Sequence, residues 1–119
     1  MKNPFFGIIL SAFAVILFAS TLPVAAAGSN IGIVASDWKF TPGTITVHLN
    51  KPTTLQLSSR EGVHGLASPE LGIPNTMIVP NGKVTVTFTP KKLGTYVIHC
   101  SVMCGAGHPN MKLVVKVVR

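Results

Sequence analysis

Acidic residues are scarce in this chain of 119 residues, which contains only Asp37, Glu61 and Glu70. The three carboxylates are spread along the sequence and offer no obvious pair for general acid–base catalysis. The chain also lacks a serine in the nucleophile-elbow pattern of hydrolases. We therefore expect no bond-making catalysis by this chain alone.

Aromatic residues are also few, at 7% of the chain, and the arginines are not clustered. Ten Lys and Arg residues outweigh the three acids and give a formal net charge of +7, but the longest basic run is Lys91-Lys92. Without clustered arginines or stacking aromatics, nucleic acid is not expected as a partner. A basic surface of this kind suits an acidic protein partner or an anionic membrane surface better.

The longest hydrophobic run lies at the N-terminus and covers residues 5–18, after a short flank that carries Lys2. Pro23 and small residues up to Ala27 follow, as in a secretory signal peptide that is cleaved after residue 27. Residues 5–22 could instead form an uncleaved hydrophobic helix that anchors the chain in a membrane. In both cases residues 28–119 are expected to be one exported domain, in the periplasm or at the outer face of the cytoplasmic membrane.

Beyond the leader the sequence lacks repeats, low-complexity tracts and any long helical pattern, and apolar and polar residues alternate with a period of two. Turn-forming residues such as Pro42-Gly43 and Asn81-Gly82 separate the alternating segments. The predicted strands are 31–35, 44–49, 53–58, 76–79, 83–89, 95–100 and 111–118. Short strands at this density predict an all-β fold, a β-sandwich with Greek-key connections. Residues 59–75 alternate poorly and are predicted to form a loop that carries function.

Cysteine is limited to Cys100 and Cys104, four residues apart. Two cysteines in an exported chain normally suggest a disulfide. A disulfide here would close a very small ring and contribute little stability by restricting the unfolded chain. It would also leave the neighbouring His108 and Met111 unexplained.

These thiols, the imidazole and the thioether lie within one loop, and soft sulfur ligands combined with imidazole favour copper. Cys104, His108 and Met111 would suffice for a mononuclear blue-copper site. Cys100 adds a second thiolate, and two thiolates at this separation could bridge a pair of copper ions.

A further imidazole must come from elsewhere, and His64 is the best candidate because it follows a predicted strand in a loop. His48 occupies a polar position in an alternating strand and should face solvent. His99 precedes Cys100 on a strand, so its side chain should point to the opposite face.

The pattern Cys-x3-Cys-Gly-x2-His-x2-Met, with an upstream His-Gly, resembles the copper (CuA) domain of cytochrome c oxidase subunit II, a cupredoxin. The resemblance extends to Phe40-Thr41-Pro42, Pro69-Glu70-Leu71-Gly72-Ile73 and Gly94-Thr95-Tyr96. It implies that Cys100 and Cys104 bridge two copper ions. One copper would also bind His64 and Met111, and the other His108 and the backbone carbonyl of Val102.

The sequence departs from the family at three points. Val102 stands where the family usually has an acidic residue, which puts a further metal bound by that carboxylate in doubt. The family's aromatic run is reduced to Trp38 and Phe40, and we expect Trp38 to be a buried core residue. The domain is basic, whereas subunit II commonly binds a basic cytochrome c through an acidic surface, so its donor should differ.

The resemblance predicts an electron carrier that passes electrons from a c-type cytochrome or another, acidic donor to a membrane oxidase or reductase. Apolar neighbours such as Val63, Val102 and Met103 are expected to exclude water from the site. Four alternatives stay open: a mononuclear copper carrier, a periplasmic copper-delivery protein, a zinc site formed by His64, Cys100, Cys104 and His108, and a small disulfide.

Overall fold

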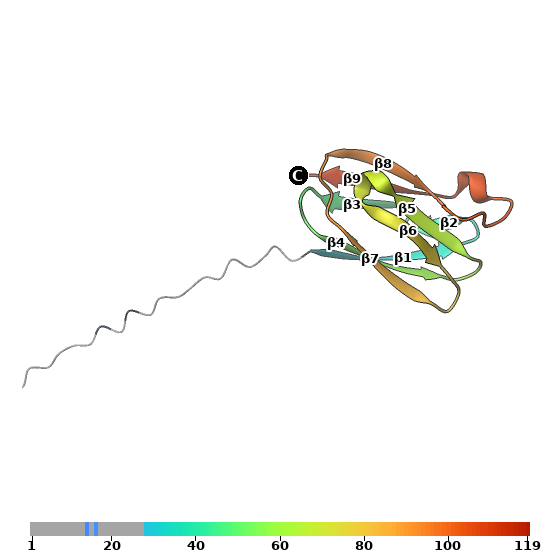
Figure 1. The fold of residues 1–119 in the computed structure, drawn as a ribbon, viewed down its shortest axis with the longest axis horizontal. Coiled ribbons are helices and arrows are strands. Elements are labelled where there is room, and N and C mark those ends of the chain that lie inside the picture. Colours follow the sequence, from blue (N-terminus) through green and yellow to red (C-terminus); the bar gives the residue numbers. More distant parts are fainter. Residues whose placement is uncertain (1–13, 15, 17–27) are drawn as a thin grey trace, which may run out of the picture.

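The computed structural model describes Ala14, Ile16 and residues 28–119. Within residues 28–119 the chain forms nine β-strands and two short 3-10 helices (Figure 1). The strands are β1 (Ser29–Ser36), β2 (Lys39–Thr41), β3 (Thr44–His48), β4 (Thr53–Ser59), β5 (His64–Ser68), β6 (Ile73–Ile78), β7 (Lys83–Phe88), β8 (Gly94–His99) and β9 (Lys112–Val118), and the helices are η1 (Pro69–Leu71) and η2 (His108–Asn110). The predicted all-β sandwich is confirmed.

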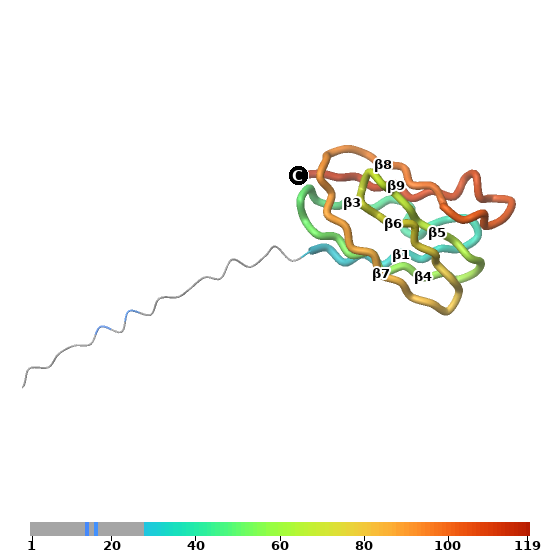
Figure 2. The backbone as a smooth tube through the Cα atoms, viewed as in Figure 1, coloured from blue at the N-terminus to red at the C-terminus, as the bar shows by residue number. Residues whose placement is uncertain are grey.

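The strands form two main sheets and one smaller ladder. The first sheet has the order β2-β1-β4-β7, the second β3-β9-β8, and β5 pairs with β6. The chain passes from β1 and β2 in the first sheet to β3 in the second and back to β4, as expected of Greek-key connections (Figure 2). The β5–β6 ladder contacts β7 and β8, so it covers one side between the two sheets.

Alternating side chains from the facing strands fill the core. Leu55 and Leu57 of β4 and Leu113 and Val115 of β9 are at most 1% exposed, and the residues between them, Gln56 and Val114, are more exposed. Burial of each such side chain stabilises the fold by about 1.5–3 kcal/mol relative to exposure. The apolar positions of the alternating pattern in the sequence are therefore the residues that line the two inner faces of the sandwich.

Two strands were not predicted, and the starts of β1 and β6 were predicted too late. β1 begins at Ser29, two residues before its predicted start. β2 has only three residues, which is too few for an alternating pattern. β5 was placed in the 59–75 loop, but four of its five residues are buried, so both of its faces are covered and polar residues do not alternate along it. For β6, the structure places the start at Ile73, three residues before the predicted start.

The predicted N-terminal helix of the leader lies outside the described residues, apart from Ala14 and Ile16. No helix in the described part of the chain is long and apolar enough to cross a membrane. β1 begins at Ser29 and is joined at once to the body, because the Ser29 amide donates to the Pro52 carbonyl at 3.1 Å.

Candidate metal centre

The loop between β8 and β9 is closed at its base by main-chain hydrogen bonds. Cys100 follows β8, Met111 precedes β9, and the Cys100 amide donates to the Met111 carbonyl at 3.0 Å. Near the tip, the His108 amide donates to the Gly105 carbonyl at 3.1 Å, and η2 with Pro109 turns the chain back towards β9. The loop therefore starts and ends at one point, which brings its donor atoms together.

The Cys104 sulfur lies at the centre of these donors. Its Sγ is 3.6 Å from Cys100 Sγ, 3.6 Å from His108 Nδ1 and 3.7 Å from Met111 Sδ. The Cys100 thiol also donates to the Val102 carbonyl at 3.2 Å, so that carbonyl faces the cluster. The structure thus brings together all five predicted donors of the loop.

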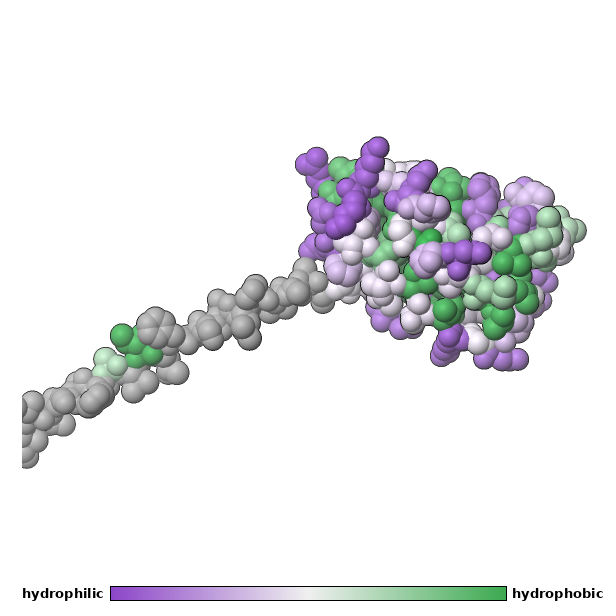
Figure 3. Space-filling model, viewed as in Figure 1, coloured by the Kyte–Doolittle hydropathy of each residue, from purple (hydrophilic) through white to green (hydrophobic). Residues whose placement is uncertain are grey.

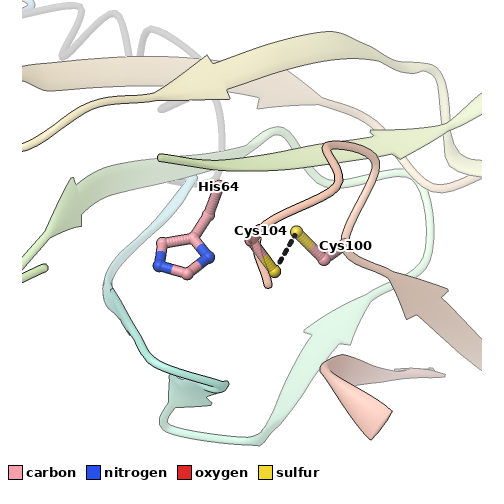
Figure 4. Close-up of side chains that lie close together, drawn as sticks. All are labelled: His64, Cys100 and Cys104. Atoms are coloured by element: carbon pink, nitrogen blue, oxygen red, sulfur yellow. Dashed lines mark hydrogen bonds between the residues drawn. The ribbon is translucent and has the colours of Figure 1, made fainter. Parts of the chain in front are cut away.

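His64 reaches the same cluster from the first residue of β5. Potential ligand atoms of His64, Cys100 and Cys104 all lie within 4.8 Å of one another, and Figure 4 shows a His64 ring nitrogen directed towards the thiols. His64 is fully buried and belongs to a paired strand, not to the predicted loop. Its pairing with Ile78 of β6 fixes the position of the ring.

The two nitrogens of His64 have different surroundings. Nε2 lies 2.8 Å from the Glu61 carbonyl oxygen, whereas Nδ1 is buried and has no hydrogen-bond partner in the described part of the chain. A buried polar atom without a partner is costly and calls for an explanation. If Nε2 carries the proton and donates to Glu61, Nδ1 keeps a free lone pair, which is what a metal ion requires.

Both thiols are free in this structure, so a disulfide does not join them. Burial, and next the hydrogen bond with Cys100, raise the pKa of the Cys104 thiol from 9.0 to about 11. The protein without metal therefore keeps this proton at neutral pH. A metal that binds the thiolate must displace it.

The donor set fits copper better than zinc. It combines two thiols, two imidazoles, a carbonyl and the thioether of Met111, which is fully buried beside Cys104. A zinc site needs only four nitrogen or sulfur ligands and would leave this thioether without a role. Soft sulfur ligands with imidazole match copper, and two sulfurs this close could contact the same pair of ions.

Trp38 is not the buried core residue that was predicted. Its side chain is 42% exposed, and its Nε1 donates to the Cys104 carbonyl at 3.2 Å. A Cβ atom at Gly107 would lie 2.4 Å from the indole ring, so the ring packs directly on the loop backbone. Trp38 lies over the ligand loop because glycine allows this approach, while Phe40 takes the core position.

The predicted exclusion of water by apolar neighbours is only partly realised. Met103 is 80% exposed and Val63 is 39% exposed, while Val102 is half-buried. Figure 3 shows apolar side chains on the end of the body where Figure 1 places the ligand loop. The cluster is shielded by the core beneath it and by Trp38, and the outer side chains face solvent.

The side chains of the other two histidines, His48 and His99, are exposed, and each has the orientation predicted for it. His48 is exposed at the end of β3, where its Nδ1 lies 3.4 Å from the Arg119 carbonyl. His99 is exposed while its neighbour Cys100 is buried, because successive strand residues face opposite sides.

Sequence reasoning missed contacts that come from distant segments. The Ser101 hydroxyl donates to Asn75 Oδ1 at 2.8 Å, and the Ser101 amide donates to the Gly65 carbonyl at 3.1 Å. These bonds fasten the start of the ligand loop to β5 and β6. No local pattern in the sequence signals them, since they depend on how the strands pair.

Comparisons with known proteins identify the family of this fold. The model of the Cupredoxin-like domain matches residues 7–115. Cytochrome c oxidase subunit 2 of Thermus thermophilus is 31% identical over 79 residues, which cover 66% of this chain and 58% of that protein. This chain therefore corresponds to little more than half of that relative.

Solved structures share the fold at lower identity. The periplasmic domain of subunit II of cytochrome oxidase (CoxB) of Bradyrhizobium japonicum superposes with a TM-score of 0.70 at 20% identity, covering 78% of this chain and 86% of that one. Auracyanin from Roseiflexus castenholzii gives a TM-score of 0.60 at 21% identity, covering 78% and 99%. The resemblance to subunit II is confirmed, and the chain belongs to the cupredoxin-like domain family.

Proposed function

We propose that this protein carries electrons through a CuA-type centre of two copper ions. The observation that supports the proposal best is the pair of free sulfurs 3.6 Å apart, with imidazoles of His64 and His108 and the thioether of Met111 around them. A mononuclear site would need only one of the sulfurs. Family membership and the relation to subunit II support copper as the metal.

Each donor has a distinct place in the proposed centre. Cys100 and Cys104 would bridge both copper ions. His64 and Met111 would complete one ion, and His108 and the carbonyl of Val102 the other. The bound pair would supply a single electron shared between two metals, so that the ligand geometry changes little on electron transfer.

The protein's part is to hold these donors still. The hydrogen bond between Cys100 and Met111 closes the loop, and the bonds of Ser101 to β5 and β6 fasten it to the ladder that carries His64. Glu61 orients the His64 ring through its carbonyl. A rigid donor set keeps the rearrangement at each transfer small.

The relatives also suggest where the electrons come from and go. We propose an exported, periplasmic protein that accepts electrons from a cytochrome c-like or other redox protein with an acidic surface and delivers them to a membrane oxidase or reductase. The named relatives are a subunit of cytochrome c oxidase and the periplasmic domain of such a subunit. The net charge of this chain supports an acidic donor surface.

Copper reconstitution tests the proposal. Reduced protein is loaded with copper, and metal per chain and the electron paramagnetic resonance spectrum are measured. We expect two coppers per chain and a hyperfine pattern of one unpaired electron shared equally by two copper nuclei. One copper per chain with a single-nucleus pattern would overturn the dinuclear centre.

A mononuclear carrier is the second candidate, because Cys104 Sγ lies within 3.7 Å of both His108 Nδ1 and Met111 Sδ without any help from Cys100. The electron paramagnetic resonance spectrum described above distinguishes a mononuclear centre from a dinuclear one. Rapid transfer of copper to a metal-free acceptor protein, without electron exchange with a cytochrome, would instead indicate copper delivery.

A further inference from the structure

The side of His64 that faces away from the thiols meets an acidic residue. Its Nε2 lies 2.8 Å from the Glu61 carbonyl and 3.6 Å from Asp37 Oδ1. Asp37 lies between β1 and β2, 27 positions earlier in the chain than His64. A carboxylate this close to a ligand ring acts on whatever the ring binds.

We propose that Asp37 is a positioning residue of the metal centre, whose negative charge behind His64 lowers the reduction potential of the bound copper. The inference rests on the proposed function and goes beyond it, because it names a residue outside the donor set that regulates the centre. The Glu61 carbonyl fixes which nitrogen of the ring carries the proton. Asp37 then adds charge on the same side.

The chain holds Asp37 in this place through the turn that precedes β5. The Asp37 amide donates to Glu61 Oε1 at 3.3 Å. The Ser59 hydroxyl lies 3.0 Å from the Glu61 carbonyl oxygen and 2.6 Å from that of Gly62, and so fixes the turn. The turn that orients His64 therefore also binds the backbone of Asp37.

Gly62 makes the approach of the carboxylate to the ring feasible. Its φ is +74°, a conformation that residues with a side chain rarely adopt. A Cβ atom at this position would lie 2.8 Å from Asp37 Oδ1 and 3.2 Å from His64 Nε2. Any side chain here would push the carboxylate and the imidazole apart.

The sign of the effect follows from charge. Oxidation adds positive charge to the copper pair, and a nearby negative charge stabilises that state. The carboxylate therefore favours the oxidised centre and lowers the potential. Asp37 is 36% exposed, so solvent screens part of its charge, and added salt should weaken the effect.

A graded series of neutral variants tests the proposal by redox titration of the copper-loaded protein. Asp37→Asn keeps the size of the side chain and removes the charge. Glu61→Gln removes a charge nearby, on a side chain that meets the Asp37 amide. Glu70→Gln removes a charge in η1, away from the centre.

We expect the potential to rise most in D37N, less in E61Q and not measurably in E70Q, and the D37N shift to shrink in high salt. The potential of Asp37→Glu, which keeps the charge, should stay closer to that of the wild type. A D37N potential equal to that of the wild type or of E70Q overturns the inference. If D37N fails to fold, Asp37→Ser provides the second neutral variant with the same expected rise.

A readout on the metal-free protein is independent of copper. Nitrogen-15 NMR of the imidazoles should show His64 protonated at Nε2, with a Nε2 resonance that moves in D37N and not in E70Q. Protonation at Nδ1, or an unmoved resonance in D37N, contradicts the inference.

The two hypotheses fail in different ways. A wild-type spectrum with copper on a single nucleus defeats the dinuclear centre, while the potential series and the NMR comparison still report on Asp37 through His64. A shared-electron spectrum combined with an unchanged D37N potential defeats only the role of Asp37.

Discussion

The two ends of the sandwich are held together by different kinds of contact. At the end where β1 begins, main-chain bonds join the turns: the Leu49 amide donates to Val118 at 2.8 Å and the Asn50 amide to Pro90 at 2.8 Å. At the ligand end, main-chain bonds also close the loop, and sulfur, imidazole and indole contacts centred on Cys104 are added to them. We infer that the first end serves stability and the second serves function, so substitutions should separate the two.

The largest effect is expected from Cys104→Ser. The Cys104 sulfur contacts Cys100, His108 and Met111, so its loss should abolish the dinuclear spectrum, while the half-buried position should limit the loss of stability. Metal analysis and electron paramagnetic resonance measure the loss of the copper centre, and chemical unfolding measures the loss of stability. His99→Gln, beside Cys100 on the opposite face, is the control and should retain both copper ions. A normal spectrum in C104S would show that this sulfur does not bridge.

A substitution in the core should reduce stability and leave the copper centre intact. Leu55 of β4 is fully buried, and Leu55→Ala should cost about 2–5 kcal/mol in the free energy of unfolding. The copper spectrum of the folded variant should stay unchanged, because Leu55 lies outside the donor cluster. Gln56→Ala, at the next and exposed position, should change stability by no more than about 0.5 kcal/mol. Altered copper signals in folded L55A would show that the two ends are coupled.

Trp38→Phe should give a smaller effect at the ligand end. It removes the bond from Nε1 to the Cys104 carbonyl and leaves an aromatic ring over the loop. A lost bond of about 0.5–1.5 kcal/mol should speed copper release to a chelator roughly two- to tenfold. Tyr96→Phe, which loses a bond to the Lys92 carbonyl, is the matched control and should release copper at the wild-type rate. Equal rates in both variants would mean that Trp38 does not hold the loop.

A last effect, on the stability of the metal-free protein, should come from pH. Burial raises the pKa of Cys104 from 9.0 to about 11, so above pH 9 the unfolded chain loses this proton before the folded one does. The free energy of unfolding should therefore be unaffected by this group below pH 9 and fall as pH rises towards 11. Urea unfolding at several pH values measures this contribution. Cys104→Ala should lack it, and an identical decline in that variant would assign it to other groups.

Much of the fold could be predicted from the sequence, because strands with one buried face show alternating apolar and polar residues. β4 and β9 were predicted nearly to their ends for that reason. β5 escaped prediction because it is covered on both faces and carries no alternation. The loop donors Cys100 to Met111 were visible as a group because they are local in sequence.

Sequence by itself determined the types of donor and their spacing, since chemistry and chain connectivity place sulfur and imidazole in a single loop. Only the tertiary structure decided which distant groups meet them. The pairing of β5 with β6 aims His64 at the thiols, the turn near Gly62 brings Asp37 behind its ring, and close packing places Trp38 over the loop. Such contacts depend on strand register and on the shapes of neighbouring side chains, and no local pattern encodes either one.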